Sequence, residues 1–470
     1  MKIDSIDVET AITNARQLIE KEVGLSPALR SALEILLLLV TLLMHRFGLN
    51  SSNSSKPPAS DPNRKKKSRA RSNKPTGGQK GHIGTTLVKV DDPDEVEFIK
   101  IDRRTIPAGN YTVDGYESRQ VFDIDIRRVV LEYRAQRLIN EQGQRFVASF
   151  PEDVTKSVQY GKQLKAHAVY LSQYQLLPYL RIKEYFADQL QVPLSEGSLI
   201  NFNQQAFENL ATFESICKQR LAEASVVHAD ETGININGSK RWLHCASNAL
   251  WTHYFPHAKR GKEAMDAIGI LPHFHGTLCH DHWKPYYKYT FTHALCNAHH
   301  LRELTCAWEQ DGQRWAKKME ILLLKINQVV DDAGGKLETK KALHYRQRYR
   351  NLLQKAQTQC PPPLSPPGKP KRGRLKRSKS RNLLERLINY EDDVLRFMTD
   401  IDVPFTNNRG ENDIRMTKVQ QKISGCFRSE QGALTFCRTR GYLSTCRKHH
   451  VSASEALTLI FNGQLPEFTQ

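Results

Sequence analysis

The sequence predicts an α/β protein with a mixed sheet at its centre and helical regions on either side along the chain. Three runs of β-forming residues follow one another between residues 226 and 255. Apolar residues recur at helical spacing through residues 157–222 and 300–400. A chain of 470 residues is too long for one ordinary core, so we expect a large central domain flanked by smaller ones.

The N-terminal region, residues 1–50, is predicted to be helical. Ser26 and Pro27 suit the cap and first turn of a helix that continues through the leucine-rich run from Leu33 to Met44. This run is shorter than the roughly 20 residues that span a bilayer, and the first residues lack the pattern of a signal peptide. No membrane contact is therefore expected. The leucine-rich face should pack either within the same chain or against a second copy, as in a homo-oligomer.

Residues 51–90 are predicted to form a flexible basic linker that binds DNA. Their Ser, Asn, Pro, Gly and Lys content cannot bury a core. The whole chain carries a formal charge of +19, and clustered positive charge favours a polyanionic partner, with DNA as the leading candidate. The linker residues expected to contact DNA are Lys65, Lys66, Lys67, Arg69 and Lys80.

Two regions separate this linker from the sheet. Residues 91–156 alternate apolar and polar in short runs such as 128–133, a pattern consistent with a few antiparallel strands. Residues 157–222 change to helical spacing. They can form either a helix-turn-helix-like DNA reader or a plain helical bundle, and the sequence does not choose between the two.

The core is expected to span residues 223–420. An Asn-Gly pair at 237–238 separates its first two strands, and such a pair is the strongest short signal for a hairpin. A third strand at 250–255 leads to a short helix and then to a fourth strand at 276–281. This order of three-strand meander, helix and strand matches the ribonuclease-H-like arrangement, in which carboxylates lie on the first and fourth strands.

A helical insertion is expected within the core at about residues 305–400, and residues 421–470 should form a helical C-terminal region. Residues 361–381 interrupt the insertion with proline and basic side chains, which predicts a loop suited to a phosphate backbone.

Cysteine usage indicates a reducing compartment. The nine cysteines are odd in number and none precedes Cys217, unlike a secreted disulfide framework. We expect a cytoplasmic protein.

Three acidic residues lie where such a core would carry chemistry. Asp230 and Asp281 each end a run of β-forming residues, and Glu411 follows a segment typical of a helix N-terminus. Two carboxylates about 4 Å apart repel by roughly 4 kcal/mol at an effective dielectric of 20, so three of them need compensating cations. Two magnesium or manganese ions would supply that charge and support phosphoryl transfer.

Each acid also has an ordinary structural explanation. Asp230 is compatible with a plain strand end, and Asp281 with the start of the turn before Trp283. Glu411 is compatible with a capping box on Asn408, three residues earlier.

A zinc site is the rival metal interpretation. The pairs Cys279–His282 and Cys296–His299 have suitable ligand spacing. Cys279 lies within an apparent core strand, however, where a buried cysteine acts as a small hydrophobe. Zinc is therefore not expected.

Six ordered motifs resemble transposases of the insertion sequence 66 family and together extend over nearly the whole chain. They are residues 77–82 (GGQKGH), 228–232 (HADET), 279–286 (CHDHWKPY), 296–304 (CNAHHLREL), 407–411 (NNRGE) and 422–429 (KISGCFRS).

The resemblance implies a ribonuclease-H-like core in which Asp230, Asp281 and Glu411 hold two magnesium or manganese ions. It implies a transposase that cleaves DNA at the ends of its mobile element and joins them to target DNA, assisted by proteins encoded in the same element. It also suggests roles for His299 and Arg302 near the active site or the DNA, although a structural role for His299 is equally compatible. An inactive relative that only binds DNA is the alternative.

This chain departs from the family pattern in one respect. Many relatives carry a cysteine-based zinc module just after the Gly-Gly-Gln motif, whereas no cysteine precedes Cys217 here. Residues 91–156 are therefore interpreted as a remnant of that module without its zinc.

Basic residues accompany the third acid. Arg415 follows Glu411 by one helical turn, and Lys418 and Lys422 lie beyond it. Together with Arg302 they are expected to contact DNA phosphates beside the cut. Arg415 could instead pair with Glu411 in an exposed ion pair of little energetic value.

Overall fold

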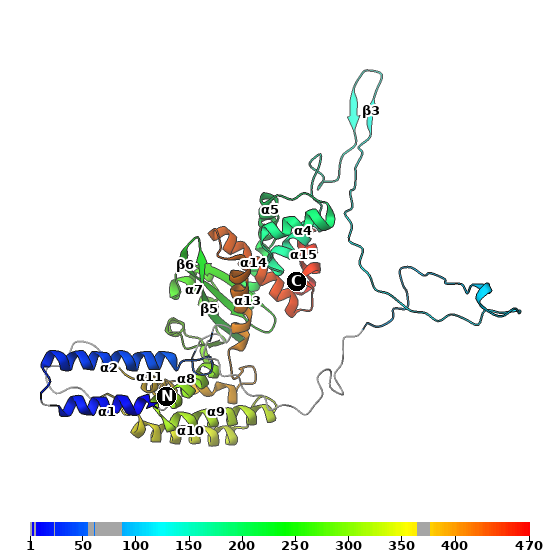
Figure 1. The fold of residues 1–470 in the computed structure, drawn as a ribbon. Helices are drawn as coiled ribbons and strands as arrows, with labels where there is room; N and C mark the ends of the chain where they lie inside the picture. Colours follow the sequence, from blue (N-terminus) through cyan, green and yellow to red (C-terminus); the bar gives the residue numbers. More distant parts are fainter. Residues whose placement is uncertain (1, 4–5, 23, 55–60, 62–86, 364–376) are drawn as a thin grey trace.

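The structure, a computed structural model, describes residues 2–3, 6–22, 24–54, 61, 87–363 and 377–470. These residues form a mixed α/β fold in which one sheet lies between groups of helices (Figure 1). The predicted DNA contacts of the linker, Lys65, Lys66, Lys67, Arg69 and Lys80, lie outside the described residues, as does the motif at 77–82.

A five-stranded mixed sheet has the strand order β7-β6-β5-β8-β9. The first three strands along the chain form an antiparallel meander, and the last two run parallel to β5. Asn237 and Gly238, between β5 and β6, have φ angles of 46° and 77°, the left-handed conformations that a tight hairpin turn requires. The strands are β5 (Val226–Ile236), β6 (Ser239–Ser247), β7 (Thr252–His257), β8 (Thr277–His280) and β9 (Thr292–Leu295).

The predicted order of meander, helix and fourth strand is confirmed, with α7 (Lys262–Ile268) between β7 and β8. Strand β9 has no counterpart in the sequence-based prediction. Its four residues are too few to show a clear alternation of apolar and polar positions.

Two helices cover one face of the antiparallel part of the sheet. Helix α13 (Asn408–Ser424) packs Ile414 against Ile234 and Leu243, and α14 (Glu430–Lys448) adds Phe436 and Cys437 to the same core. Because side chains alternate along a strand, Asp230 shares this face with Ile234. The first acid and helix α13 therefore lie on the same side of β5.

A helical group before the sheet packs against its opposite face, where Val227 and Ala229 join a core that also contains Met265 of α7. The predicted helical character of residues 157–222 is confirmed, and helix α15 (Ala453–Phe461) closes this core. The elements before the sheet are α3 (Lys162–Val169), the π-helical turn η3 (Tyr170–Tyr174), α4 (Tyr179–Leu190), α5 (Glu196–Asn209) and α6 (Ala211–Ala222).

The predicted helical insertion is present and packs against the parallel edge of the sheet. Cys279 of β8 and Leu295 of β9 share a core with Trp315 and Tyr349 of the insertion. Its helices are α8 (Asn297–Asp311), α9 (Arg314–Asp332), α10 (Thr339–Gln359), α11 (Lys379–Asn389) and α12 (Glu391–Leu395).

The region 91–156 contains less regular structure than its sequence pattern predicts. One hairpin is present, formed by β3 (Arg137–Ile139) and β4 (Arg145–Val147). The run 128–133 is not a strand, and its apolar side chains are exposed, with Val129 84% accessible. Alternation in sequence cannot produce a sheet without a core to pack against.

The N-terminal helices form a hairpin of α1 (Val8–Lys21) and α2 (Pro27–Phe47). Ser26 caps α2 by accepting the Leu29 N–H (3.2 Å), with Pro27 in the first turn, as predicted. Side chains of its leucine-rich face such as Leu36 are more than half exposed in the part of the chain that the structure describes. The apolar stretch begins earlier than the predicted run from Leu33 to Met44. Pro27–Met44 is long and apolar enough to cross a membrane by length and composition alone, but core helices and signal sequences pass the same test.

A buried ion cluster joins α6, α14 and β7. The Glu214 carboxylate accepts a hydrogen bond from Arg438 Nε (2.7 Å) and lies 3.2 Å from His253 Nε2. Burial alone would raise the pKa of Glu214, but the hydrogen bond with His253 and the nearby positive charges lower it to about 2. A lowered pKa in the folded state means that the carboxylate stabilises the fold above its ordinary pKa, and that this contribution is lost as the pH falls through about 2.

Glu214→Gln should lower the free energy of unfolding at pH 7 by about 3 kcal/mol, because it leaves the Arg438 guanidinium in a largely buried place without its partner. The difference from the parent should shrink as the pH falls from about 4.5 toward 2. Denaturant unfolding followed by circular dichroism at several pH values measures both effects. Glu184→Gln, at an exposed position, is the matched control and should change stability by less than about 0.5 kcal/mol. Equal losses in the two variants would contradict the prediction.

Candidate active site

The candidate active site lies where the carboxyl end of β8 meets β5, between two interior strands of the sheet. These strands are parallel, with His228 opposite Cys279. Extending this register by two residues brings Asp230 opposite Asp281, the residue that follows β8. Since neighbouring strands are about 4.8 Å apart, the first two predicted acids belong to one place at this end of β8.

The charges of both other predicted acids act on Asp230, although the carboxylate oxygens of the three do not all lie within 4.8 Å of one another. The pKa of Asp230 is raised to about 8, and burial is the largest cause. The neighbouring Glu231 carboxylate and the charges of Asp281 and Glu411 also raise it. Asp230 thus lies where negative charge is concentrated, and where a cation would be stabilised.

Asp281 also begins a tight turn, as its alternative interpretation predicted. Its Oδ1 accepts the backbone N–H of Trp283 (3.0 Å). His282 between them has a φ of 72°, a left-handed conformation that a side chain with a Cβ adopts at a cost. Asp281 therefore both begins the turn and lies beside Asp230.

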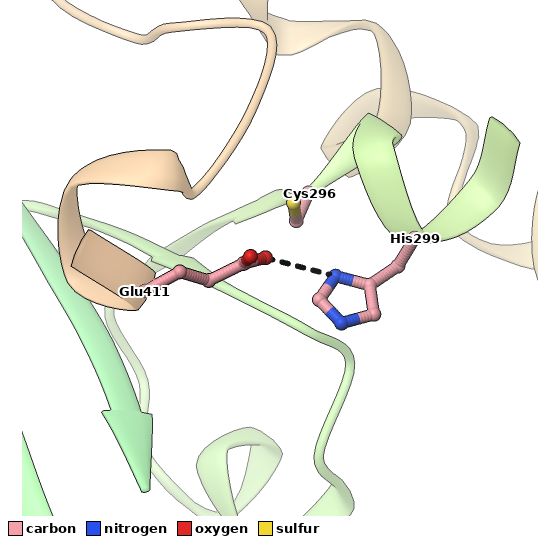
Figure 2. Close-up of side chains that lie close together, drawn as sticks. All are labelled: Cys296, His299 and Glu411. Carbon is pink, nitrogen blue, oxygen red and sulfur yellow. Dashed lines mark ion pairs between the residues drawn. The ribbon is translucent and has the colours of Figure 1, made fainter. Parts of the chain in front are cut away.

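Glu411 reaches the site from the first turn of α13 and is partly buried. Its Oε1 lies 3.7 Å from His299 Nδ1 on α8 (Figure 2). The guanidinium of Arg302, on the same helix, lies 3.5 Å from Oε1. Oε1 and Nδ1 are buried, and neither has a hydrogen-bond partner within the part of the chain that the structure describes.

Two alternative explanations of Glu411 are wrong. Helix α13 begins at Asn408, so the residue before the helix is Asn407 and no capping box forms on Asn408. The ion-pair partners of Glu411 in the described residues are Arg302 and His299, and no ion pair with Arg415 is found there. The reason is that α13 directs its first turn toward the start of α8.

Asn407 fixes the start of α13 to the sheet. Its side-chain Nδ2 donates to the Ala229 carbonyl (2.9 Å), and its Oδ1 lies 2.7 Å from His228 Nδ1. Burial is the main cause of the lowering of the His228 pKa to about 4, so this histidine is neutral near pH 7 and its Nδ1–H donates to the amide oxygen. The Asn407 backbone N–H donates to Cys296 Sγ (3.1 Å), just before α8. One asparagine therefore joins β5, α8 and α13.

Gly410 leaves room for this arrangement. A Cβ at residue 410 would lie 3.2 Å from Asn407 Oδ1, closer than van der Waals contact allows without a shift. The glycine directly before Glu411 is thus explained by the buried amide beside it.

A second network fixes the loop that follows β8. The Glu231 side chain is 1% exposed and accepts hydrogen bonds from Arg260 Nε and from the Tyr286 hydroxyl, both at 2.8 Å. The Arg260 guanidinium lies over the rings of Trp283 (3.9 Å) and Trp242 (4.8 Å), where cation–π attraction adds to the ion pair. This network connects β5 with the loop that carries the second acid.

Comparison with known families decides the family of the chain. The family model described as "Transposase IS66 family" matches residues 157–435, more than half of the chain and all of the site described above. The chain belongs to the transposase IS66 family. A second model, a family of unknown function (DUF6444), matches residues 4–87. No curated protein matches the chain.

The basic residues predicted to contact DNA in this transposase-family chain differ in their exposure and in their partners. Arg302 is partly buried beside Glu411, whereas Arg415 and Lys422 are exposed on α13. Lys418 donates from its Nζ to the Gly233 carbonyl (2.6 Å), which ties it to β5. Arg302 and the two exposed residues stay predictions as DNA contacts, while Lys418 has a structural partner.

The two cysteine–histidine pairs do not form the four-ligand zinc site considered from the sequence. Cys279 is buried in the core beside α8 and α9, and His282 Nδ1 lies 2.9 Å from the Tyr287 hydroxyl. Cys296 and His299 are brought together, but with Glu411 in place of the other pair.

The sequence-based reasoning missed the supporting residues. Asn407 lies within one of the six motifs, yet no local pattern shows that its side chain reaches β5. Glu231 follows Asp230 directly and could have been noticed as a second acid in a strand, where charge requires a partner. Its partner Arg260 carries no motif signal.

Asn407→Ala should lower the free energy of unfolding by about 2 kcal/mol or more, because it leaves buried donors and acceptors at His228 and Ala229 without partners. Asn408→Ala is the matched control, since Asn408 is exposed and its loss should cost less than about 0.5 kcal/mol. Denaturant unfolding of both variants measures the difference. A stability loss confined to the control, or no loss in either variant, would show that the buried amide does not hold α13.

Proposed function

We propose that this chain is a metal-dependent DNA transposase that cleaves strands at the ends of its mobile element and joins them to target DNA. The observations that support this most are the parallel pairing that places Asp281 beside Asp230 and the effect of the Asp281 and Glu411 charges on the pKa of Asp230. Family membership supplies the substrate class, because a transposase acts on DNA.

We further propose that the sheet is a ribonuclease-H-like catalytic core. It is supported by the order of meander, helix and parallel strand, and by the position of the first two acids on or after strands β5 and β8. The helical insertion separates β9 from α13, so it lies between the second and third acids in sequence.

The donor set fits hard divalent cations. The raised pKa of Asp230 reflects carboxylates that burial and mutual repulsion leave undercompensated. The buried Glu411 Oε1, without a hydrogen-bond partner in the described residues, is a further oxygen available to a cation. Asp230, Asp281 and Glu411 would hold two magnesium or manganese ions. Such ions, when bound, activate a water or 3′-hydroxyl nucleophile and stabilise the leaving oxygen.

The chain's own residues supply position and charge. Asn407 holds the helix of Glu411 against β5, and the Glu231–Arg260 pair holds the loop of Asp281. Arg302, beside Glu411, would place a guanidinium near a DNA phosphate, for which its planar donors are suited.

DNA, in the form of element ends and target, is the proposed partner. The exposed leucine-rich face of α2 supports a homo-oligomer, and proteins encoded by the same element are possible accessories. The second candidate function is a relative that binds DNA without strand transfer. The presence of all three acids favours the active enzyme, and joining of precut ends separates the two.

Asp230→Asn should reduce cleavage of DNA that carries the inverted repeats flanking the gene by at least about 100-fold, since metal-stabilised charge contributes several kcal/mol to such a step. Binding of the same DNA should change by less than about threefold, because affinity depends mainly on phosphate contacts made by basic residues. Cleavage assays and a binding titration measure the two.

Asp402→Asn is the matched control, at an exposed position in the loop before α13. It should cleave at the parent's rate. Full activity in Asp230→Asn would refute the assignment of the acids, and a parent that binds the repeats yet neither cleaves nor joins them would favour the binding-only function.

A further inference from the structure

A second group of metal-binding side chains lies beside the three acids. The ligand atoms of Cys296, His299 and Glu411 all lie within 4.8 Å of one another (Figure 2). Cys296 directly precedes α8 and His299 lies in its first turn, while Glu411 comes from the first turn of α13. Three ligand types from two helix starts thus meet at one point.

The distances in this group suit a small tetrahedral cation. Zinc bonds of about 2.0–2.1 Å to nitrogen or oxygen and about 2.3 Å to sulfur place nitrogen and oxygen ligands roughly 3.3–3.4 Å apart and each of them roughly 3.6 Å from sulfur, a few tenths of an ångström closer than the pair found here. The separation of His299 Nδ1 and Glu411 Oε1 is 3.7 Å. Both atoms are buried without a hydrogen-bond partner in the described chain, so the pair is spaced for a shared cation and too far apart for a direct hydrogen bond.

The surroundings of the thiol also match a metal ligand. Cys296 Sγ accepts the backbone N–H of Asn407 (3.1 Å). A donor of this kind orients a ligand and offsets the negative charge of a thiolate, as outer partners do in metal sites. The positive charge of Arg302 would repel a cation here, since its guanidinium lies 3.5 Å from Glu411 Oε1. The Arg302 side chain is long and 27% exposed, however, so it can turn toward solvent when a cation binds.

We propose that Cys296, His299 and Glu411 form a binding site for a thiophilic divalent cation of the zinc type, distinct in its ligands from the three-carboxylate site. A thiolate and an imidazole favour zinc over magnesium, and three protein ligands leave a fourth position open. Glu411 belongs to both sites, so a zinc ion here takes a carboxylate from the hard cations and inhibits both the cleavage and the joining of DNA. This inhibition rests on the proposed function, whereas the binding does not.

Titration of the full-length protein with Co²⁺ under reducing conditions tests the binding. The parent should show the near-ultraviolet thiolate-to-cobalt absorption band. Cys296→Ser should remove the band, and His299→Ala should weaken Co²⁺ affinity at least about tenfold, a loss that even outer partners of a metal site cause. Cys426→Ser, which removes an exposed cysteine, and Asp230→Asn should both keep the band.

A band that persists in Cys296→Ser, or is absent from the parent, would overturn the site. Thermal unfolding of each variant without metal checks its fold. If Cys296→Ser fails to fold, His299→Ala decides, since it keeps the thiol: unchanged Co²⁺ affinity in that variant also overturns the site.

Joining of precut DNA ends in Mg²⁺ with increasing Zn²⁺ tests the inhibition. Zinc should inhibit the parent reversibly, and half-inhibition of His299→Ala should require at least about tenfold more zinc. Equal sensitivity of the two proteins would overturn the competition for Glu411. A parent that is inactive in Mg²⁺ alone would instead refute the proposed function, and the cobalt result would still decide the site.

Discussion

The buried side chain of Asn407 is the contact on which the candidate site depends. It connects the start of α13 with His228 and Ala229 on β5, which lie 179 and 178 positions before Asn407 in the sequence. Ile414 and Lys418 also hold α13 on β5, but the Asn407 side chain fixes the start of the helix, directly before the turn that carries Glu411. A net gain of about 1 kcal/mol per hydrogen bond is modest, but the larger cost of leaving these buried groups unpaired makes the geometry specific.

Strand β5 is the common support, and four consecutive residues on it contact other elements on both of its faces. His228 and Asp230 face α13, while Glu231 faces the loop after β8. Ala229 contributes its carbonyl to Asn407. The second and third acids are thus each fixed to the strand that carries the first. Gathering three carboxylates costs roughly 4 kcal/mol for each close pair, and these two networks supply rigid positions in which a cation can offset that cost.

Local signals in the sequence predicted local structure well. Asn237 and Gly238 predicted the hairpin because their left-handed conformations are confined to two residues, and Ser26 predicted the start of α2 because its cap bond spans one turn. Asp281 was placed correctly, directly after β8, whereas Asp230 lies within β5 (Val226–Ile236) and not at the strand end that was predicted. The family followed from six ordered motifs and is confirmed by the match over residues 157–435.

What failed depends on contacts that no local pattern encodes. The run 128–133 alternates like a strand but pairs with no strand among the described residues. The alternative pairing of Glu411 with Arg415 rested on nearness in sequence, whereas Arg302 and His299, for which the resemblance suggested roles near the active site, are its neighbours in space. Such pairings arise because the segment before α13 is hydrogen-bonded to the start of α8, so only the folded chain reveals them.

A crystal structure of the protein in Mn²⁺, with anomalous scattering from the metal, tests most directly whether the three acids form one site. Two anomalous peaks, roughly 3.5–4 Å apart and bounded by oxygens of Asp230, Asp281 and Glu411, are expected for a two-metal centre. Manganese bound elsewhere, or a centre that Glu411 does not touch, would contradict the arrangement on which the proposed chemistry depends.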